Sequence, residues 1–197
     1  MAAEAAVGKP LSLIAAACTC NGKLGIGLNG DLPWNLRKEM AYFSRMTSTS
    51  TVTGKKNAVI MGRKTWFSIP AAHRPLKDRT NVVLSKSLKE CPTGADHLCQ
   101  SLPEAVKLLS SPPLADSIDL VWVIGGFQVY KDAMESPYCH RIYLTRVMKE
   151  IECDTFFPEF DLNRFKLVTD PAVSTEVQEE NGIQYKYEIY EHLRQSE

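Results

Sequence analysis

The sequence predicts an α/β protein with a doubly wound, mostly parallel sheet and helices on both of its faces. Four apolar runs with the length of buried strands recur along the first two thirds of the chain, and segments with helical periodicity separate them. Such alternation of buried strands and helices is typical of a parallel sheet. A hairpin signal near the C-terminus predicts an antiparallel pair that closes one edge of this sheet.

The first predicted strand runs from Leu11 to Cys18 and is apolar except for Ser12. The other three apolar runs are 57–61, 80–84 and 119–124, and a glycine or a serine follows each of them. Helical periodicity is present at 35–47, near 64–68, at 102–110 and at 127–134.

The last third of the chain predicts antiparallel strands. Residues 141–147 have the composition of a strand, and the segment 173–193 contains Asn181-Gly182, the strongest short hairpin signal. Beyond that turn, uncharged and charged side chains alternate, which is the period of a half-exposed strand. The alternating positions are Tyr185, Lys186, Tyr187, Glu188 and Ile189.

Composition limits the classes of function. We expect one domain over residues 11–197, after a flexible lead-in over residues 1–10 that lacks the features of a signal or transit peptide. The 23 basic residues balance the 23 acidic ones, and no apolar run is long enough to span a membrane. The expected partners are therefore small molecules and neither nucleic acid nor membranes.

The cysteines indicate a reduced, intracellular chain. The six cysteines include no C-x-x-C pair and the four histidines are scattered, so the sequence predicts no metal site. Cys18 and Cys20 stand at the end of an apolar run, where cysteines are mostly small buried hydrophobes, and we assign them no role.

One carboxylate interrupts the apolar stripe of the helix predicted at 35–47. On a helical wheel this stripe consists of Leu36, Glu39, Met40 and Phe43. No cation stands three or four residues from Glu39 on its own helix. Two interpretations stay open, namely a core carboxylate with a tertiary partner and a functional acid.

The glycines that precede this helix imitate a dinucleotide-binding motif without meeting its conditions. The stretch from Gly25 to Trp34 has the G-x-G-x-x-G spacing, but Pro33 interrupts a helix start and no acid follows about 20 residues later. We therefore interpret these glycines as a mobile loop that approaches a ligand closely.

Three predicted strands end in sequences suited to phosphate groups, at the edge where parallel sheets bind ligands. These sequences are Gly62-Arg63-Lys64-Thr65, Ser85-Lys86-Ser87 and Gly125-Gly126-Phe127. Each one alone is more often a solvated helix start or a turn. Together, with cations and without a ribose-binding acid, they favour NADP over NAD. Arg79 suits a carboxylate ligand, and an arginine before a strand is also often a surface residue.

From about Leu11 to Leu193 the chain resembles the eukaryotic dihydrofolate reductases. The motifs that carry the resemblance recur in family order and spacing. They are Gly25-Ile-Gly, Asp31-Leu-Pro-Trp34, Glu39, Tyr42-Phe43, Ile60-Met-Gly-Arg-Lys-Thr-Trp66, Ser68-Ile-Pro70, Arg74-Pro-Leu76, Arg79, Val123-Ile-Gly-Gly126, Tyr130 and Asp154-Thr-Phe-Phe-Pro158.

The resemblance implies an eight-stranded sheet of this class and the NADPH-dependent reduction of 7,8-dihydrofolate to 5,6,7,8-tetrahydrofolate, which supports one-carbon metabolism. Hydride would pass to C6 of the pterin, and a proton would reach N5. Glu39 corresponds to the acid that binds the pterin and promotes this protonation, with a pKa raised by its apolar surroundings. Trp34 corresponds to a tryptophan that orders a water, and Thr145 to a threonine that holds the carboxylate.

The resemblance also implies the binding residues, a cis bond between Gly125 and Gly126, and a grip of Arg79 on the glutamate α-carboxylate of the substrate. The implied substrate-binding residues are Ile14, Ala16, Glu39, Met40, Phe43, Ser68, Ile69, Leu76, Arg79, Ile124, Tyr130 and Thr145. The implied NADPH-binding residues are Ala16, Gly25, Ile26, Gly27, Leu28, Asn29, Gly30, Asp31, Arg63, Lys64, Thr65, Leu84, Ser85, Lys86, Ser87, Ile124, Gly125, Gly126, Phe127, Gln128, Val129 and Tyr130.

The same resemblance implies a cytoplasmic monomer that binds antifolate inhibitors, with minor nuclear or mitochondrial pools. Three features depart from the family pattern. The segment 18–24 is longer than usual, so the loop over the nicotinamide should start differently. Met40 replaces a common aromatic residue and makes a more adaptable pocket wall. Lys86 replaces a usual arginine, and its point charge should weaken recognition of the 2′-phosphate.

Two further interpretations compete with this one. A related reductase of the riboflavin pathway would share the fold and cofactor, but Trp34 with Glu39, and also Arg79, argue against it. A ligand sensor or RNA-binding regulator on the same scaffold would need no catalytic acid, and the balanced charge disfavours RNA.

Overall fold

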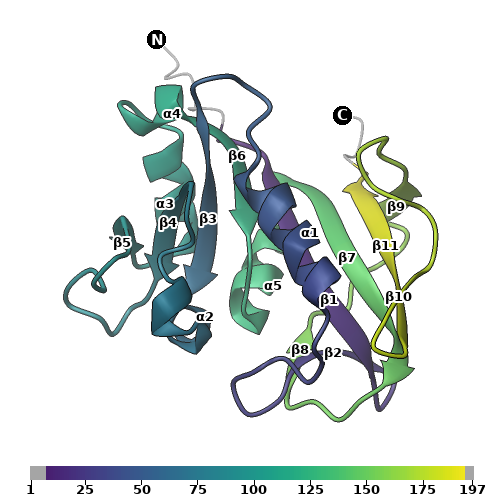
Figure 1. Cartoon of the computed structure of the whole chain (residues 1–197). Coiled ribbons are helices and arrows are strands. Elements are labelled where there is room, and N and C mark those ends of the chain that lie inside the picture. The colour runs from purple at the N-terminus through teal and green to yellow at the C-terminus, as the bar shows by residue number, and fades with distance from the viewer. Residues whose placement is uncertain (1–7, 194–197) are drawn as a thin grey trace.

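Parallel strands form the centre of the sheet, as the sequence predicts (Figure 1). The computed structural model describes residues 8–193. Within these residues the sheet has 11 strands, where the resemblance implies eight. Eight of them follow one another in the order β10 (Gln178–Glu180), β11 (Ile183–His192), β7 (Cys139–Glu150), β1 (Leu11–Cys20), β6 (Ile118–Val123), β3 (Lys56–Gly62), β4 (Arg79–Leu84) and β5 (His97–Cys99). From β7 to β5 every neighbouring pair is parallel, whereas β11 is antiparallel to β7 and to β10.

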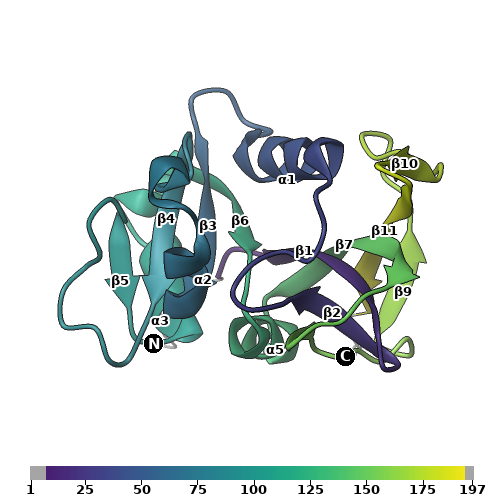
Figure 2. The same cartoon turned by 60° about the horizontal axis from the view of Figure 1, so that its bottom comes forward.

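Helices cover both faces of the sheet, so the doubly wound architecture is confirmed (Figures 1 and 2). One face carries α1 (Arg37–Ser48) and α2 (Arg63–Ser68), whose Tyr42 and Trp66 belong to one buried cluster. The other face carries α3 (Leu102–Leu109) and α5 (Phe127–Glu135), whose Val106 and Ala133 belong to a second cluster. Two short helices were not predicted, namely α4 (Leu114–Ser117) and the 3-10 helix Ala71–His73.

The antiparallel edge is also confirmed. β10 and β11 form a hairpin around Asn181 and Gly182, whose φ angles of 53° and 72° suit this turn. Besides β5, the short strands β8 (Thr155–Phe157) and β9 (Phe165–Val168) were not predicted, and β9 pairs with β11.

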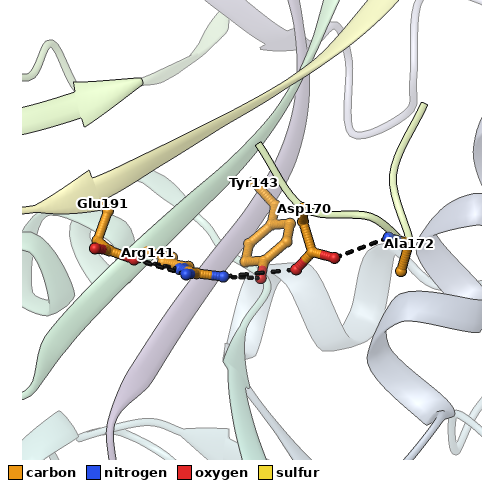
Figure 3. A network of polar contacts seen from close by, with 5 residues as sticks. All are labelled: Arg141, Tyr143, Asp170, Ala172 and Glu191. Atoms are coloured by element: carbon orange, nitrogen blue, oxygen red, sulfur yellow. Dashed lines mark hydrogen bonds and ion pairs between the residues drawn. The ribbon is translucent and has the colours of Figure 1, made fainter. Parts of the chain in front are cut away.

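A polar network fastens the loop after β9 to this edge (Figure 3). The Arg141 guanidinium donates to Glu191 at 2.7 and 2.8 Å, and it also contacts Asp170 at 3.6 Å. Asp170 accepts a hydrogen bond from the backbone N–H of Ala172 at 2.9 Å. The Tyr143 hydroxyl lies 3.5 Å from the same guanidinium, so one side chain joins β7, β11 and the loop.

The glycines at 25 and 27 lie in a strand, and their interpretation as part of a mobile loop is wrong. β1 continues to Cys20, turns at Asn21-Gly22 and returns as β2 (Lys23–Gly27), which also pairs with β8. The positive φ angles of 50° and 75° at Asn21 and Gly22 are those that a tight hairpin requires. The additional residues of the segment 18–24 thus extend an antiparallel hairpin.

The buried face of α1 differs in part from the predicted stripe. Glu39 is only 5% exposed, as expected, whereas Met40 is 46% exposed and Tyr42 is buried in its place. The Glu180 carboxylate accepts hydrogen bonds from the backbone N–H groups of Arg37 and Lys38, both at 2.8 Å, and so holds the start of α1 against β10. This anchoring turns the side with Glu39 and Tyr42 toward the sheet.

The chain already packs against the sheet before residue 11. Gly8 is buried, and Lys9 donates through Nζ to the carbonyl of Ile118 at 2.9 Å. Most of the segment 1–10 predicted as a flexible lead-in, residues 1–7, lies outside the described part of the chain. Within residues 8–193, no helix is both long and apolar enough to cross a membrane.

Asn57 provides a test of how the loop after α1 is held. Its buried amide donates to the carbonyls of Thr47 and Thr49 and accepts from the N–H of Leu120. We expect Asn57→Ala to lower the free energy of unfolding by about 3 kcal/mol, because it leaves buried polar groups unpaired. Urea denaturation measures this loss. Asn163→Ala, at an exposed position, should change stability by less than about 0.5 kcal/mol, and equal effects of the two variants would contradict the assignment.

Candidate active site

The register of the parallel strands brings the three phosphate-suited sequences to one edge of the sheet. Gly62 at the end of β3 pairs with Leu84 of β4, and Ile60 pairs with Val123 of β6. The N–H of Gly62 donates to the carbonyl of Gly125 at 2.8 Å, which joins the ends of β3 and β6 directly. The bond between Gly125 and Gly126 is cis, as the resemblance implies.

This edge offers cations and backbone donors that have no partner of their own. The side chains of Arg63, Lys64 and Lys86 are exposed and make no hydrogen bond or ion pair with a residue in the range 8–193. Neither α2 nor α5 has a side-chain cap at its start, so the first N–H groups of these helices stay free. A Cβ added at Gly126 would lie 3.6 Å from Thr65 Oγ1, so the backbone of one helix start faces a hydroxyl of the other. Such a surface suits a phosphorylated ligand.

Ser85 shapes the end of β4. Its side chain is buried, and its Oγ accepts hydrogen bonds from the N–H groups of Ser87 and Leu88 at 3.2 and 3.1 Å. Ser85 thus turns the chain so that Lys86 is exposed beside the end of β3.

Glu39 of α1 reaches a hydroxyl on the sheet. Thr145 Oγ1 donates a hydrogen bond of 2.9 Å to Glu39 Oε1. Thr145 lies on β7, between Ala16 of β1 and Tyr187 of β11, so neighbouring strands flank this contact. Burial raises the pKa of Glu39 to about 7, and the Thr145 hydrogen bond opposes that shift. This carboxyl can therefore hold or release a proton near neutral pH.

Two buried aromatic residues, Trp34 and Tyr42, flank Glu39 in the sequence. Trp34 is buried just before α1, and its Nε1 has no hydrogen-bond partner among the described residues, although buried donors normally have one. Tyr42 stacks on Tyr187 with ring centroids 3.9 Å apart, one turn of α1 beyond Glu39. Neither Tyr42 nor Tyr187 has a predicted role. The sequence signal that could indicate Tyr42 is its position three residues after Glu39, on the same side of the helix.

Arg79 at the start of β4 is held by two hydrogen bonds. Its Nε donates to the carbonyl of Lys77 and its Nη1 to Thr47 Oγ1, both at 2.8 Å, which leaves Nη2 unpaired within the described chain. Partial burial lowers the pKa of Arg79. The sequence does not indicate Thr47, because its Ser/Thr-rich surroundings predict a loop. In the structure Thr47 is a buried residue in the last turn of α1.

Apolar side chains of α1 and of the loop after α2 pack against one buried cluster. Phe43 of α1 and the loop residues Ile69 and Leu76 pack against one cluster, which also includes Ile14 and Ile124. The Tyr130 hydroxyl donates to the carbonyl of Ile14 at 2.8 Å. Met40 is on the exposed side of α1, and the exposed Ser68 donates to the carbonyl of Thr65.

The predicted cofactor segment 25–31 divides into two parts. Gly25 and Gly27 are buried in β2, whereas Asn29, Gly30 and Asp31 are exposed beyond it. A carboxylate holds this exposed part, because the N–H of Asn29 donates to Asp154 Oδ2 and the N–H of Asp154 donates to the carbonyl of Gly27, both at 2.9 Å. Sequence reasoning missed this clamp, which depends on the pairing of β2 with β8.

Two predicted cofactor residues have exposed side chains. Phe127 and Gln128 are exposed on the first turn of α5. Phe127 borders a separate cavity of about 680 Å³ between α5 and β8, which shares no other residue with the predicted sites.

Comparison with known proteins decides the family. The family model described as dihydrofolate reductase matches residues 10–192. The chain belongs to the dihydrofolate reductase family. Dihydrofolate reductase from Gallus gallus is 56% identical over 185 residues, which cover 93% of this chain and 96% of that protein. The protein of the same name from Aedes albopictus is 51% identical over 186 residues, with 93% and 97% covered.

A solved structure supports the same conclusion. Schistosoma mansoni dihydrofolate reductase superposes with a TM-score of 0.81 at 36% identity and covers 94% of this chain and 100% of that one. As a member of the dihydrofolate reductase family, the chain is an enzyme of the oxidoreductase class.

The raised pKa of Glu39 predicts how the stability of the ligand-free protein depends on pH. Because the pKa is about 7 in the folded state and 4.5 as the ordinary value, the folded state binds more protons than the unfolded state between these pH values. Wild-type stability relative to Glu39→Gln should therefore fall by up to about 3 kcal/mol as the pH rises from about 4.5 to 8.

Urea unfolding of both proteins over this pH range measures the effect. Glu135→Gln, at an exposed position of α5, serves as the control for the removal of a surface carboxylate. A constant difference for Glu39→Gln would mean that Glu39 ionises normally.

Proposed function

We propose that this chain reduces 7,8-dihydrofolate to 5,6,7,8-tetrahydrofolate with NADPH. The observation that carries the proposal is the buried Glu39 carboxyl of α1, with a pKa of about 7, which Thr145 holds against a sheet whose strand ends present exposed cations without a partner among residues 8–193. Bound NADPH would supply the hydride for C6 of the pterin. The protein would then bind the pterin, exclude water and direct a proton to N5.

Glu39 is proposed to bind the pterin and to promote protonation at N5. Its Oε1 is fixed by Thr145, so Oε2 stays available to accept from N3 and the 2-amino group of the pterin. At neutral pH a pKa of about 7 leaves a large fraction of this carboxyl protonated. The unpaired Nε1 of Trp34 fits a donor to a water that passes the proton to N5.

Arg79 is proposed to hold the glutamate tail of the substrate. The bonds to Lys77 and Thr47 fix the guanidinium plane, which favours a two-pronged pair with the α-carboxylate. The cluster of Phe43, Ile69 and Leu76 would then contact the benzoyl group between the pterin and this carboxylate.

The strand ends fit NADPH. Gly125 and Gly126 let the backbone approach a pyrophosphate at the start of α5, where no side-chain cap competes. Arg63 and Lys86, unpaired within residues 8–193, suit the 2′-phosphate that distinguishes NADPH from NADH. The loop 28–31, held by Asp154, would lie against the nicotinamide.

We further propose a cytoplasmic monomer that binds antifolates in the pterin pocket. All six cysteines are free thiols, which fits a reducing compartment.

The primary test of the activity is a spectrophotometric assay with NADPH and dihydrofolate, in which loss of absorbance reports turnover. Absence of turnover in folded protein that binds both ligands would contradict the proposal.

Glu39→Gln tests the role of the acid. We expect turnover at neutral pH to fall by about 10²- to 10⁴-fold while NADPH binding is retained, because the variant cannot assist proton transfer. Activity should partly recover in acid, where more of the substrate is already protonated. Steady-state kinetics over pH and NADPH fluorescence titration measure these effects. Glu135→Gln should behave as wild type, and near-normal turnover of Glu39→Gln at neutral pH would rule out the role.

Arg63→Ala combined with Lys86→Ala tests the 2′-phosphate site. We expect KM for NADPH to rise at least about tenfold, with little change for NADH, because charge-assisted hydrogen bonds to the phosphate are lost. Lys107→Ala with Lys166→Ala removes two exposed cations elsewhere and serves as the control. Equal effects on both cofactors would show that Arg63 and Lys86 do not contact this phosphate.

A further inference from the structure

Three thiols meet where the β1–β2 hairpin packs against the segment between β7 and β8. Cys18 Sγ lies 3.5 Å from Cys153 Sγ, although the two residues are 135 positions apart in the chain. Cys20, two residues further along the same strand, accepts a hydrogen bond from the N–H of Cys153 at 3.3 Å. Cys18 is 1% exposed and Cys153 is 9% exposed, so Cys153 is the more accessible member of the pair.

Cys153 directly precedes Asp154, the residue that holds the loop 28–31, which is proposed to contact the cofactor. Asp154, the next residue, binds the carbonyl of Gly27 and the N–H of Asn29, both at 2.9 Å. Gly25 pairs with Cys18 in the hairpin, and a Cβ at Gly25 would lie 2.5 Å from Cys153 Sγ. The missing side chain of Gly25 therefore provides the space that Cys153 occupies.

We propose that Cys18 and Cys153 form a dithiol that small disulfides oxidise to an intrachain disulfide, and that this bond alters the clamp on residues 25–31. The effect on cofactor exchange rests on the proposed function, whereas the formation of the bond does not. The two sulfur atoms must approach by about 1.5 Å to reach bonding distance. Residues 151–154 lie outside any strand, and the N–H of Ile151 donates to the carbonyl of Thr19 at 3.0 Å, so this segment already lies against β1.

The chemistry balances with a low-molecular-weight disulfide as the oxidant. The Cys153 thiolate attacks one sulfur of the oxidant, and one equivalent of the small thiol leaves. The Cys18 thiolate then attacks Sγ of Cys153 in this mixed disulfide, and the second small thiol leaves. The protein loses two electrons and two protons, and the oxidant is reduced to two thiols.

The burial of Cys18 and Cys153 makes their oxidation slow. Burial, and next the Cys18 thiol, raise the pKa of Cys153 to about 12, so little thiolate is present at neutral pH. The pair therefore stays reduced during brief exposure to an oxidant and reacts only under sustained oxidation. Cys91 is exposed and should react first, which makes its removal necessary in any experiment.

The test uses the full chain with Cys91→Ser. After prolonged incubation with oxidised glutathione, we expect two of the five remaining thiols to be lost. Peptide mapping should find one cross-link, between the peptides that contain Cys18 and Cys153, and dithiothreitol should reverse it. Cys18→Ser and Cys153→Ser should each abolish the cross-link, whereas Cys20→Ser should retain it. No cross-link, or one between other cysteines, overturns the proposal.

Cofactor exchange provides the second measurement. We expect the cross-linked protein to release NADPH at least about twofold more slowly than the reduced protein in stopped-flow fluorescence, because a tethered Cys153 restricts the clamp. An unchanged rate in fully cross-linked protein overturns the proposed link to the loop. Failure of the reduced protein to bind NADPH would instead contradict the proposed function, and the thiol measurements would still decide whether the bond forms.

Discussion

The parallel register of β1, β6, β3 and β4 is the constraint on which the rest of the site depends. Because these strands are paired in parallel, their carboxyl ends lie at one edge, and residues far apart in the chain become neighbours there. The hydrogen bond from Gly62 to Gly125 fixes the distance between two of these ends. A shift in this register would separate the cations near β3 and β4 from the glycines after β6.

α1 adds the acid to this edge, and its orientation depends on contacts at both ends. Glu180 anchors its first turn, and Thr47 at its last turn accepts from Arg79. Between these anchors Glu39 is taken out of water with a single hydrogen-bond donor, Thr145. Such an environment costs stability when the carboxyl ionises, and it is also what brings the pKa near neutral pH.

The sequence predicts the strands and helices of the centre well, because each carries its own periodicity. It predicts the hairpin at Asn181-Gly182, where the flanking residues alternate, and it misses the equivalent pair Asn21-Gly22. There the glycines of β2 interrupt the alternation of side chains after the turn and imitate a ligand-binding loop. Local pattern is therefore a weaker guide where a strand is short and rich in glycine.

In the candidate site too, the sequence predicts the features that have a local pattern and misses those that depend on distant contacts. The unusual position of Glu39 is visible in the sequence, whereas Met40 was assigned to the buried stripe because the wheel cannot include the anchoring of α1 by Glu180. Contacts that depend on the pairing of distant segments, such as Asp154 with Asn29 and Arg79 with Thr47, have no local signature. Their identification requires the register of the sheet and the position of the loops.

The close approach of Cys153 to Gly25 has an evolutionary consequence. The Cβ of any residue other than glycine at position 25 would overlap Cys153 Sγ, so the volumes available at these two positions are shared. Substitutions here should be compensatory, with a larger residue at 25 accepted only beside a smaller one at 153. Lineages that keep this hairpin should therefore show covariation between the two positions.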